Sequence, residues 1–257
     1  MSTHENTVTV LTGCTKGLGL AMATQLAAQA GSLITLSRLV MPALTEAASK
    51  GQTRLTQIAV DLGDGQALEA AAQQMRQAIA QALTQKPTSV RIIHNAGLVH
   101  PVAPADRQTD WEAINMAFNV NITAPIFLNA HFLQATEGAP DRRIMLISSG
   151  AGRNGTHGWD VYCATKAAMD RYAEVVDVEK HANTRISSMA PGVIDTPMQE
   201  TIRTTPLDKF PNRQRFEDMK AQGVLAQAPE TARRLLAILQ RDDYGRTVID
   251  DVRNHTF

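Results

Sequence analysis

The 257-residue sequence predicts an α/β fold, a doubly wound parallel sheet of about seven strands covered by helices. Two observations predict it. Short apolar runs rich in β-branched residues alternate along the chain with longer segments of helical pattern, which is typical of βαβ units. The short runs show little alternation of polar and apolar residues, and this indicates strands that are covered on both faces.

Each expected strand is a short apolar, β-branched run, and each expected helix is a longer segment between two such runs. The expected strands, in chain order, are residues 8–12, 33–37, 57–60, 91–94, 144–148, 185–189 and 247–249. The expected helices are residues 17–30, 67–83, 110–133, 161–181 and 229–240. The second helix lies in an Ala- and Gln-rich stretch of strong helix formers without interior Gly or Pro.

The organisation along the chain favours one domain over residues 1–257, because no linker, repeat or low-complexity tract divides it. One segment stands out. Residues 198–223 are polar and form a stretch too long for a plain connection. Because long segments of this kind often bind ligands or act as lids, we expect a substrate loop at about 196–223.

The composition narrows the class of protein. Hydrophobic residues make up 44% of the chain and charged residues 19%, which is typical of a globular protein. The formal net charge of +0 argues against a nucleic-acid or anionic membrane surface. Cys14 and Cys163 lie far apart without metal-ligand spacing, so we expect no metal site and no disulfide.

The N-terminal sequence and the lengths of the apolar runs indicate the cellular location of the protein. The stretch MSTHENTVTV has neither the basic region nor the apolar run of a signal peptide. No apolar run approaches the roughly 18 residues of a membrane span. With the two cysteines, this predicts a cytoplasmic protein.

A glycine-rich stretch, GCTKGLG, follows the first expected strand and precedes the first expected helix. Glycine lets the backbone approach a pyrophosphate closely, and a helix N-terminus offers free N–H groups to it. The spacing G-x-x-x-G-x-G differs from the general dinucleotide pattern, and alone it also fits a plain strand–helix turn. Its position after the first strand favours a nucleotide site.

The residues after the second expected strand indicate which nucleotide binds. An acidic residue about 20 positions beyond the glycines would bind a ribose 2′-hydroxyl, but this strand ends in Ser37-Arg38. Arg38 can instead pair with a 2′-phosphate, and Lys16 in the glycine-rich stretch adds a second positive charge. The alternative is that both are surface cations. Together they favour NADP(H) over NAD(H) as cofactor.

Tyr162 and Lys166 stand four positions apart, so on a helix they share one face. A phenol has a pKa of about 10, and a nearby ammonium lowers it by stabilising the phenolate. Such a tyrosine can act as a general acid or base near neutral pH, with Ser149 hydrogen-bonded to the substrate oxygen. The alternative for a Tyr-x-x-x-Lys pair taken alone is an ordinary helix surface.

Six motifs together resemble the short-chain dehydrogenase/reductase family over essentially the whole chain. They are T-G-x-x-x-G-x-G at 12–19, Asn95-Ala96-Gly97, Asn121 (in preference to Asn119), Ser149 (13 residues before the tyrosine, in preference to Ser148), Tyr162 with Lys166, and Pro191-Gly192 with Thr196. Each motif is weak alone, but their order makes the match specific. The resemblance implies a Rossmann-type fold and an oxidoreductase.

The resemblance also implies roles for individual residues. Tyr162 would be the general acid/base, Ser149 would orient the carbonyl, Lys166 would bind the nicotinamide ribose, and Asn121 would extend a proton relay. Asp61 matches an aspartate that contacts the adenine. The expected cofactor-binding residues are Gly13, Thr15, Lys16, Gly17, Leu18, Gly19, Arg38, Asp61, Leu62, Asn95, Ala96, Gly97, Tyr162, Lys166, Pro191, Gly192, Val193, Ile194 and Thr196.

A narrower similarity is to sepiapterin reductases and to bacterial reductases of benzil, an aromatic 1,2-diketone. It is carried by Gly158-Trp159 and by the run Asp195, Thr196, Met198 and Gln199. It implies substrate contacts from Ser149, Trp159, Tyr162 and Met198, although Trp159 also fits a tryptophan packed at a helix start. Sepiapterin reductases carry an aspartate near the C-terminus that anchors the pterin, and either Asp250 or Asp251 could match it.

These observations lead to an NADPH-dependent carbonyl reductase acting on one ketone of a 1,2-dicarbonyl or related substrate. Two alternatives stay open. The chain could bind NADP(H) as a sensor without turnover, since fold does not fix function, or it could be an NADP-dependent alcohol dehydrogenase of another substrate. By resemblance, pairing through residues 110–133 and 161–181 would give a homodimer or homotetramer.

Overall fold

A computed structural model describes residues 6–257, and it contains the predicted α/β architecture. Within that range a seven-stranded sheet has the order β3-β2-β1-β4-β5-β6-β9, and each neighbouring pair is parallel. Its strands are β1 (Thr7–Thr12), β2 (Gly31–Ser37), β3 (Thr53–Ala59), β4 (Ser89–His94), β5 (Arg142–Ile147), β6 (Thr184–Ala190) and β9 (Ile249–Asp251). The predicted fold class is confirmed. The signal-peptide interpretation rests partly on residues 1–5, which lie outside the described residues.

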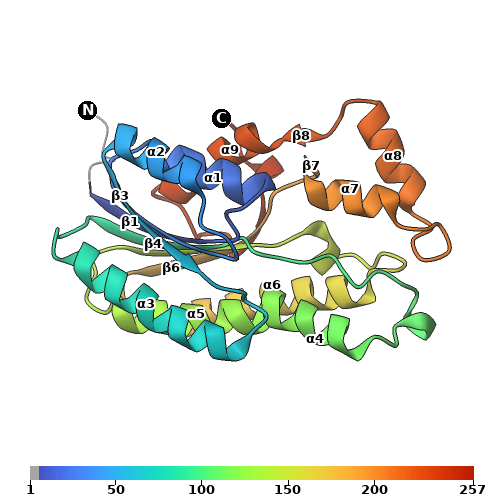
Figure 1. Cartoon of the computed structure of the whole chain (residues 1–257), viewed down its shortest axis with the longest axis horizontal. Helices are drawn as coiled ribbons and strands as arrows, with labels where there is room; N and C mark the ends of the chain where they lie inside the picture. Colours follow the sequence, from blue (N-terminus) through green and yellow to red (C-terminus); the bar gives the residue numbers. More distant parts are fainter. Residues whose placement is uncertain (1–5) are drawn as a thin grey trace.

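Helices cover both faces of the sheet (Figure 1). One layer contains α1 (Gly17–Ala27), α2 (Pro42–Gly51) and α9 (Ala228–Gln240), and the other contains α3 (Gly65–Leu83), α4 (Trp111–Phe118), α5 (Ala124–Ala135) and α6 (Asp160–Val178). Among the helices in the described residues, none is long and apolar enough to cross a membrane.

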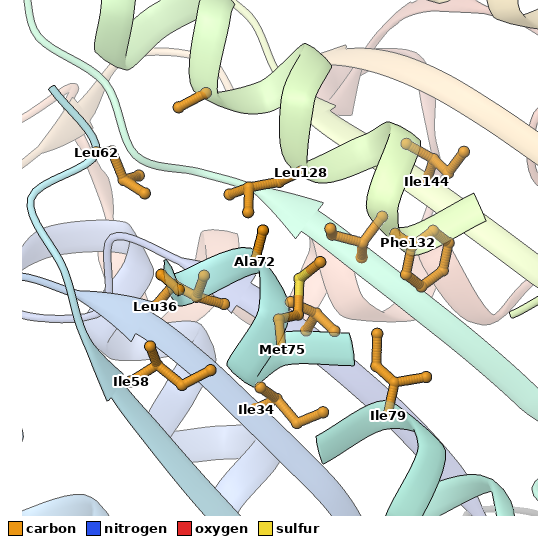
Figure 2. Close-up of a cluster of buried hydrophobic side chains, with 14 of the residues drawn as sticks. Ile34, Leu36, Ile58, Leu62, Ala72, Met75, Ile79, Leu128, Phe132 and Ile144 are labelled. Carbon is orange, nitrogen blue, oxygen red and sulfur yellow. The ribbon is translucent and has the colours of Figure 1, made fainter. Parts of the chain in front are cut away.

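The core has two halves, one on each side of the sheet. Along β2, Leu33 packs with the α1 layer, whereas Ile34 and Leu36 pack with the α3 layer. Figure 2 shows the second half, where these strand residues meet Met75 of α3 and Phe132 of α5. Because a covered parallel strand needs apolar side chains on both faces, its sequence is a nearly continuous apolar run.

The strand order reverses beside β1. The chain passes from β1 outward to β2 and β3, then returns to place β4 on the other side of β1. The helices after β1 and β4 therefore diverge to opposite faces, and a crevice opens at the carboxyl ends of these two strands. The glycine-rich stretch and the Asn95-Ala96-Gly97 motif both follow this edge.

Several segments differ from the predicted elements. The predicted helix 110–133 is divided by a π-helical turn, η2 (Asn119–Thr123), between α4 and α5. Helix α2 was not predicted, because Pro42 opens a short helix in which only Leu44 and Ala48 are buried. The last strand of the sheet was expected at 247–249. It is β9, which begins at Ile249, and its residues 249–251 pair with β6.

The segment 196–223, expected as a loop, contains two helices, α7 (Pro197–Thr204) and α8 (Arg213–Ala221). They lie together at one end of the molecule (Figure 1). Two short strands, β7 (Ile194–Asp195) and β8 (Ala226–Gln227), pair in parallel at the base of this segment. Its polar composition concealed the helices, since Ile202 and Phe216 are among its few buried residues. The remaining 3-10 turns are η1 (Ala105–Arg107), η3 (Gly150–Gly152) and η4 (Val252–Asn254).

Candidate active site

A cavity of about 950 Å³ lies at the carboxyl ends of the strands. Most of the residues predicted for the site line it, from the glycine-rich stretch, the ends of β2, β4 and β5, the start of α6 and the segment after β6. The predicted residues in its wall are Gly13, Thr15, Lys16, Gly17, Leu18, Arg38, Asp61, Leu62, Asn95, Ala96, Gly97, Ser149, Trp159, Tyr162, Lys166, Pro191, Gly192, Val193, Ile194, Thr196 and Met198. Gly19 and Asn121 stand behind this wall.

The glycine turn, residues 13–16, joins β1 to α1. Gly13 has a φ of +74°, and a Cβ there would stand 2.7 Å from the Cα of Ala96. Glycine is therefore required for both its conformation and its packing. Lys16 is the N-cap of α1, and no side chain of the described residues caps the helix at that position. The first N–H groups of α1 thus remain available to an anion.

Thr12 and Asn95 connect the glycine turn to β4. The Thr12 hydroxyl oxygen accepts hydrogen bonds from the backbone N–H groups of Asn95 (3.0 Å) and Ala96 (3.1 Å). In return, Asn95 Nδ2 donates to the carbonyl oxygens of Thr12 (3.1 Å) and Gly13 (3.0 Å). These four bonds fix the two strand ends that form one wall of the cavity. Thr12 was predicted only as the first letter of a motif.

Two exposed cations stand where the cavity passes the ends of β1 and β2. Arg38 follows β2 directly, and Lys16 lies in the glycine turn. Asp61, after β3, lines the same cavity, and its Oδ1 accepts a hydrogen bond from the backbone of Gly63 at 2.9 Å. This end of the cavity therefore carries two positive charges and one carboxylate that is partly engaged by its own turn.

Tyr162 and Lys166 occupy the first turns of α6 and are both buried. Lys166 Nζ lies 5.8 Å from the centroid of the Tyr162 ring and donates a hydrogen bond to the carbonyl oxygen of Ile147 at 2.8 Å. Burial lowers the pKa of Lys166 to about 8, and the negative charge of Asp170 acts against that shift. The predicted pair is thus not an ordinary helix surface.

Burial favours the protonated form of the Tyr162 phenol. Burial raises its pKa to about 12, and a hydrogen bond with Ser149 acts in the opposite direction. Ser149 is the N-cap of η3, and its Oγ also accepts a hydrogen bond from the backbone N–H of Ala151 at 3.2 Å. A hydroxyl and a phenol therefore meet at the wall of the cavity, which suits a ligand with an oxygen acceptor.

Ser148 has a different environment from Ser149, although the two are adjacent. Its Oγ donates to the Asp170 carboxylate at 2.6 Å and is buried. Two neighbouring residues of an extended strand end point to opposite sides, so only one of them can reach Tyr162.

Asn121 lies inside the π-helical turn η2. Its Oδ1 accepts from the backbone N–H of Leu98 (2.7 Å), while its Nδ2 donates to the Leu98 carbonyl (2.8 Å) and to Thr165 Oγ1 (3.0 Å). A Cβ on Gly97 would stand 3.5 Å from Asn121 Oδ1 and 3.6 Å from Lys166 Nζ. The amide therefore ties the loop after β4 to α6, with Gly97 between it and the ammonium.

An aromatic cluster borders the Tyr162 end of the cavity. Trp159 is stacked on Phe210 with ring centroids 4.9 Å apart, and it packs against Phe216 at 5.5 Å and edge-on against Tyr162 at 5.4 Å. Phe216 and Met198 also line the cavity. Trp159 is thus both packed at a helix start and part of the wall. The two phenylalanines, which were not predicted for the site, come from the segment 196–223 that sequence reasoning treated as a loop.

Asp250 and Asp251 differ in their position relative to the cavity. Asp251 lines it and is paired with Arg253 at 2.6 Å. Asp250 is bonded to His255 Nε2 at 2.8 Å and to Asn254 Nδ2 at 3.1 Å. Of the two carboxylates, Asp251 is the one that lines the cavity.

Comparisons with known proteins agree with this geometry. The family model described as short chain dehydrogenase matches residues 7–207. The benzil reductase ((S)-benzoin forming) of Bacillus cereus is 33% identical over 239 residues, 91% of this chain and 94% of that protein. The sepiapterin reductase of Rattus norvegicus is 32% identical over 248 residues, 92% of each chain. A crystal structure of a short-chain dehydrogenase/reductase from Burkholderia vietnamiensis is 31% identical with a TM-score of 0.66, and the match covers 99% of this chain and 100% of that one.

Proposed function

Because the chain belongs to the short chain dehydrogenase family and is an oxidoreductase of carbonyl or alcohol groups, we propose that it is an NADPH-dependent carbonyl reductase. Its substrate is a 1,2-dicarbonyl or a related compound, and one ketone of that unit is reduced. The observation that carries the proposal is the burial of Tyr162 and Lys166 together in the wall of the same cavity that contains the glycine turn.

The residues present fit a nicotinamide dinucleotide, the cofactor class of the family. Gly97 lines the cavity without a side chain, and the uncapped start of α1 suits a pyrophosphate. The cavity is long enough to join Arg38 and Asp61 to the Pro191-Gly192 segment. The cofactor-binding residues that the family resemblance implies and that lie in the cavity wall would hold the dinucleotide.

NADP(H) is favoured over NAD(H) by charge. Arg38 stands where a carboxylate would otherwise bind the 2′-hydroxyl, and Lys16 is exposed in the adjoining turn. A 2′-phosphate would gain charge-assisted hydrogen bonds from both cations, whereas a hydroxyl would gain little.

The chemistry follows from the groups that surround the carbonyl. A reduced nicotinamide, when bound, would be the source of the hydride that the carbonyl carbon accepts. Ser149 donates a hydrogen bond to the carbonyl oxygen, and the Tyr162 phenol transfers its proton to that oxygen as negative charge develops there. Lys166 stabilises the phenolate that remains, and Asn121 keeps the loop after β4 in place and extends the path by which Tyr162 regains a proton.

The substrate class rests on the relatives and on the aromatic cluster. Trp159, Phe216 and Met198 give the Tyr162 end of the cavity an apolar, aromatic wall that suits a flat aromatic group beside the reacting carbonyl. Helices α7 and α8 supply part of this wall, and we assign the segment 196–223 the role of a substrate lid. Ser149 and Tyr162 complete the contacts with the substrate.

The decisive experiment is a panel of substrates with NADPH and NADH. The purified protein should oxidise NADPH with benzil, other 1,2-diketones or sepiapterin, and NADH should be a poorer donor. Binding of NADPH without turnover of any carbonyl would instead support a sensor, and faster turnover of alcohols with NADP⁺ would support a dehydrogenase. Either result would overturn the proposed reductase.

Pairing of two or four copies is a further part of the proposal. Helices α4, α5 and α6 expose apolar side chains, including Trp111, Ile126, Val175 and Val178. Such residues suit burial against a second copy. Light scattering should give the mass of a dimer or tetramer, and Val178→Glu should lower it.

A cytoplasmic location is favoured by the free thiols of Cys14 and Cys163. Cell fractionation with an antibody to the chain would test it.

A further inference from the structure

Asp170 is a buried carboxylate that none of the predicted motifs includes. It lies on α6, one turn after Lys166, and is 8% exposed. Its Oδ1 accepts hydrogen bonds from Ser148 Oγ and Ser188 Oγ, both at 2.6 Å, and its Oδ2 lies 3.4 Å from Arg153 Nε. Burial of a carboxylate costs little folding free energy only when the carboxylate is hydrogen-bonded and paired in this way.

The partners of Asp170 belong to the frame of the candidate active site. Ser148 follows β5 and directly precedes Ser149, and Ser188 lies in β6. Arg153 follows η3 and also donates to the carbonyl oxygen of Asp250 at 2.8 Å. One carboxylate therefore joins α6, two strand ends and the loop that begins at Ser149.

The loop after Ser149 also packs tightly on this part of α6. A Cβ on Gly152 would stand 2.8 Å from the carbonyl carbon of Lys166 and 3.0 Å from Asp170 Oδ2. The loop backbone thus touches both residues, and a shift of Asp170 would move the loop.

Asp170 is also a negative charge beside a buried ammonium. Lys166 is 5% exposed; burial lowers its pKa, and Asp170 is the charge that raises it again. The other charged groups around Asp170 are Arg153 and, beyond it, Asp250 and Asp251 of β9, which pair with His255 and Arg253. Arg153 lies beside the Asp170 carboxylate, so we expect its positive charge to offset part of the effect of Asp170 on Lys166.

We propose that Asp170 is a positioning residue that keeps the ammonium of Lys166 charged and fixes the strand end that presents Ser149. Its importance for catalysis rests on the proposed function. The effect of Asp170 on the pKa of Lys166 does not depend on the proposed function, because it can be measured without substrate.

The test is a titration of the Lys166 side chain by NMR with labelled lysine, with its signal identified by its loss in Lys166→Arg. In Asp170→Asn, which keeps the shape and removes the charge, the midpoint should fall by about one to two pH units. In Arg153→Gln, which removes the opposing positive charge, it should rise. Ser188→Ala is the matched control, because it removes one hydrogen bond to the carboxylate but no charge, and the midpoint should stay.

A second measurement is the pH profile of NADPH-dependent reduction. Because the negative charge of Asp170 raises the pKa of Lys166, a limb of the profile that is set by Lys166 should move to lower pH in Asp170→Asn. The proposal would be overturned if the titration midpoint of Lys166 stayed the same in both Asp170→Asn and Arg153→Gln. It would also be overturned if Ser188→Ala shifted this midpoint as much as Asp170→Asn does. If the midpoint moves but no carbonyl is reduced by the wild-type protein, the proposed function fails and the role of Asp170 stands.

Discussion

The ammonium of Lys166 lies 5.8 Å from the ring centroid of Tyr162, and both side chains are buried on one face of α6. They stand four positions apart on the helix, so the spacing in the sequence places them on the same face. Burial displaces both groups toward their neutral forms, since it raises the pKa of the phenol and lowers that of the ammonium. Tyr162 therefore holds its phenolic proton near neutral pH, as the proposed acid requires.

Tyr162→Phe removes the proposed acid and little else. The ring keeps its contact with Trp159, whereas the proton donor is lost, so kcat for reduction should fall by roughly 10²- to 10⁴-fold. The Kd of NADPH, measured by fluorescence titration, should stay within about threefold. A variant with full activity would remove the assigned role.

Lys166 should make the stability of the protein depend on pH. Its folded pKa of about 8 lies below the usual 10.5, so the unfolded chain holds more protons between these values and stability rises with pH there. The gain is at most on the order of 3 kcal/mol.

Lys166→Met should lack this rise. The variant also loses the donor to the Ile147 carbonyl, but that cost does not depend on pH. Urea unfolding at pH 7 and pH 10 measures both proteins; the stability of Lys166→Met relative to wild type should be higher at pH 7 than at pH 10. A constant difference would contradict the lowered pKa.

Arg38→Ala should weaken NADPH selectively. Loss of a charge-assisted hydrogen bond to the 2′-phosphate should raise the Kd of NADPH by about 10- to 100-fold and leave that of NADH unchanged within about twofold. Arg38→Lys keeps the charge without the planar fork and should be intermediate. If Arg38→Ala weakened the binding of NADPH and NADH equally, Arg38 would not be a contact of the 2′-phosphate.

Gly19→Ala tests the packing behind the glycine turn. A Cβ at this position would overlap the carbonyl oxygen of Gly13 and the Nδ2 of Asn95, so the two strand ends must separate. Overpacking of this kind should cost about 1–3 kcal/mol in urea unfolding and should weaken NADPH. Gly65→Ala is the matched control, because a Cβ there would meet nothing within 4 Å. A Gly19→Ala variant as stable as Gly65→Ala would contradict the packing.

Two variants of Trp159 distinguish a packing role of its side chain from a contact with the substrate. Trp159→Ala should destabilise the protein by about 3–5 kcal/mol because the stack on Phe210 is lost, whereas Trp159→Phe should lose much less. The KM of benzil should rise in Trp159→Ala more than the KM of butane-2,3-dione, which has no aromatic ring. A parallel change in both values would assign Trp159 to packing alone.

Much of the fold could be predicted, because a covered parallel strand has an apolar signature in the sequence. The run that forms β2 is visible for this reason, whereas the start of β3 is not, since Arg54 and Thr56 interrupt it. The π-helical turn at Asn121 left no signal, because an extra residue in a helical turn changes no propensity. Helices α7 and α8 were missed since their stability depends on a few buried contacts, such as that of Phe216, which are tertiary.

For the site, the sequence motifs predicted which segments line the cavity better than they predicted which side chains contact one another. The membership of the family, predicted from six weak motifs, is confirmed by the match over residues 7–207. Most of the predicted residues share one cavity wall, but Phe210, Phe216 and Asp170 were not foreseen. Phe210 and Phe216 come from a segment that was expected as a loop, and the hydrogen-bond partners of Asp170 lie 18 and 22 positions away in the sequence.

The π-helical turn η2 also sets a limit on how this chain can change length. A π-helical turn holds one more residue than an α-helical turn, so removing one residue from Asn119–Thr123 would leave a regular helix in which α5 keeps nearly the same orientation. Leu128 and Phe132, both fully buried on α5, would still face the sheet. We therefore expect a single deletion in this turn to preserve the packing of α5, whereas a single deletion inside α5 would rotate the residues beyond it by about 100°.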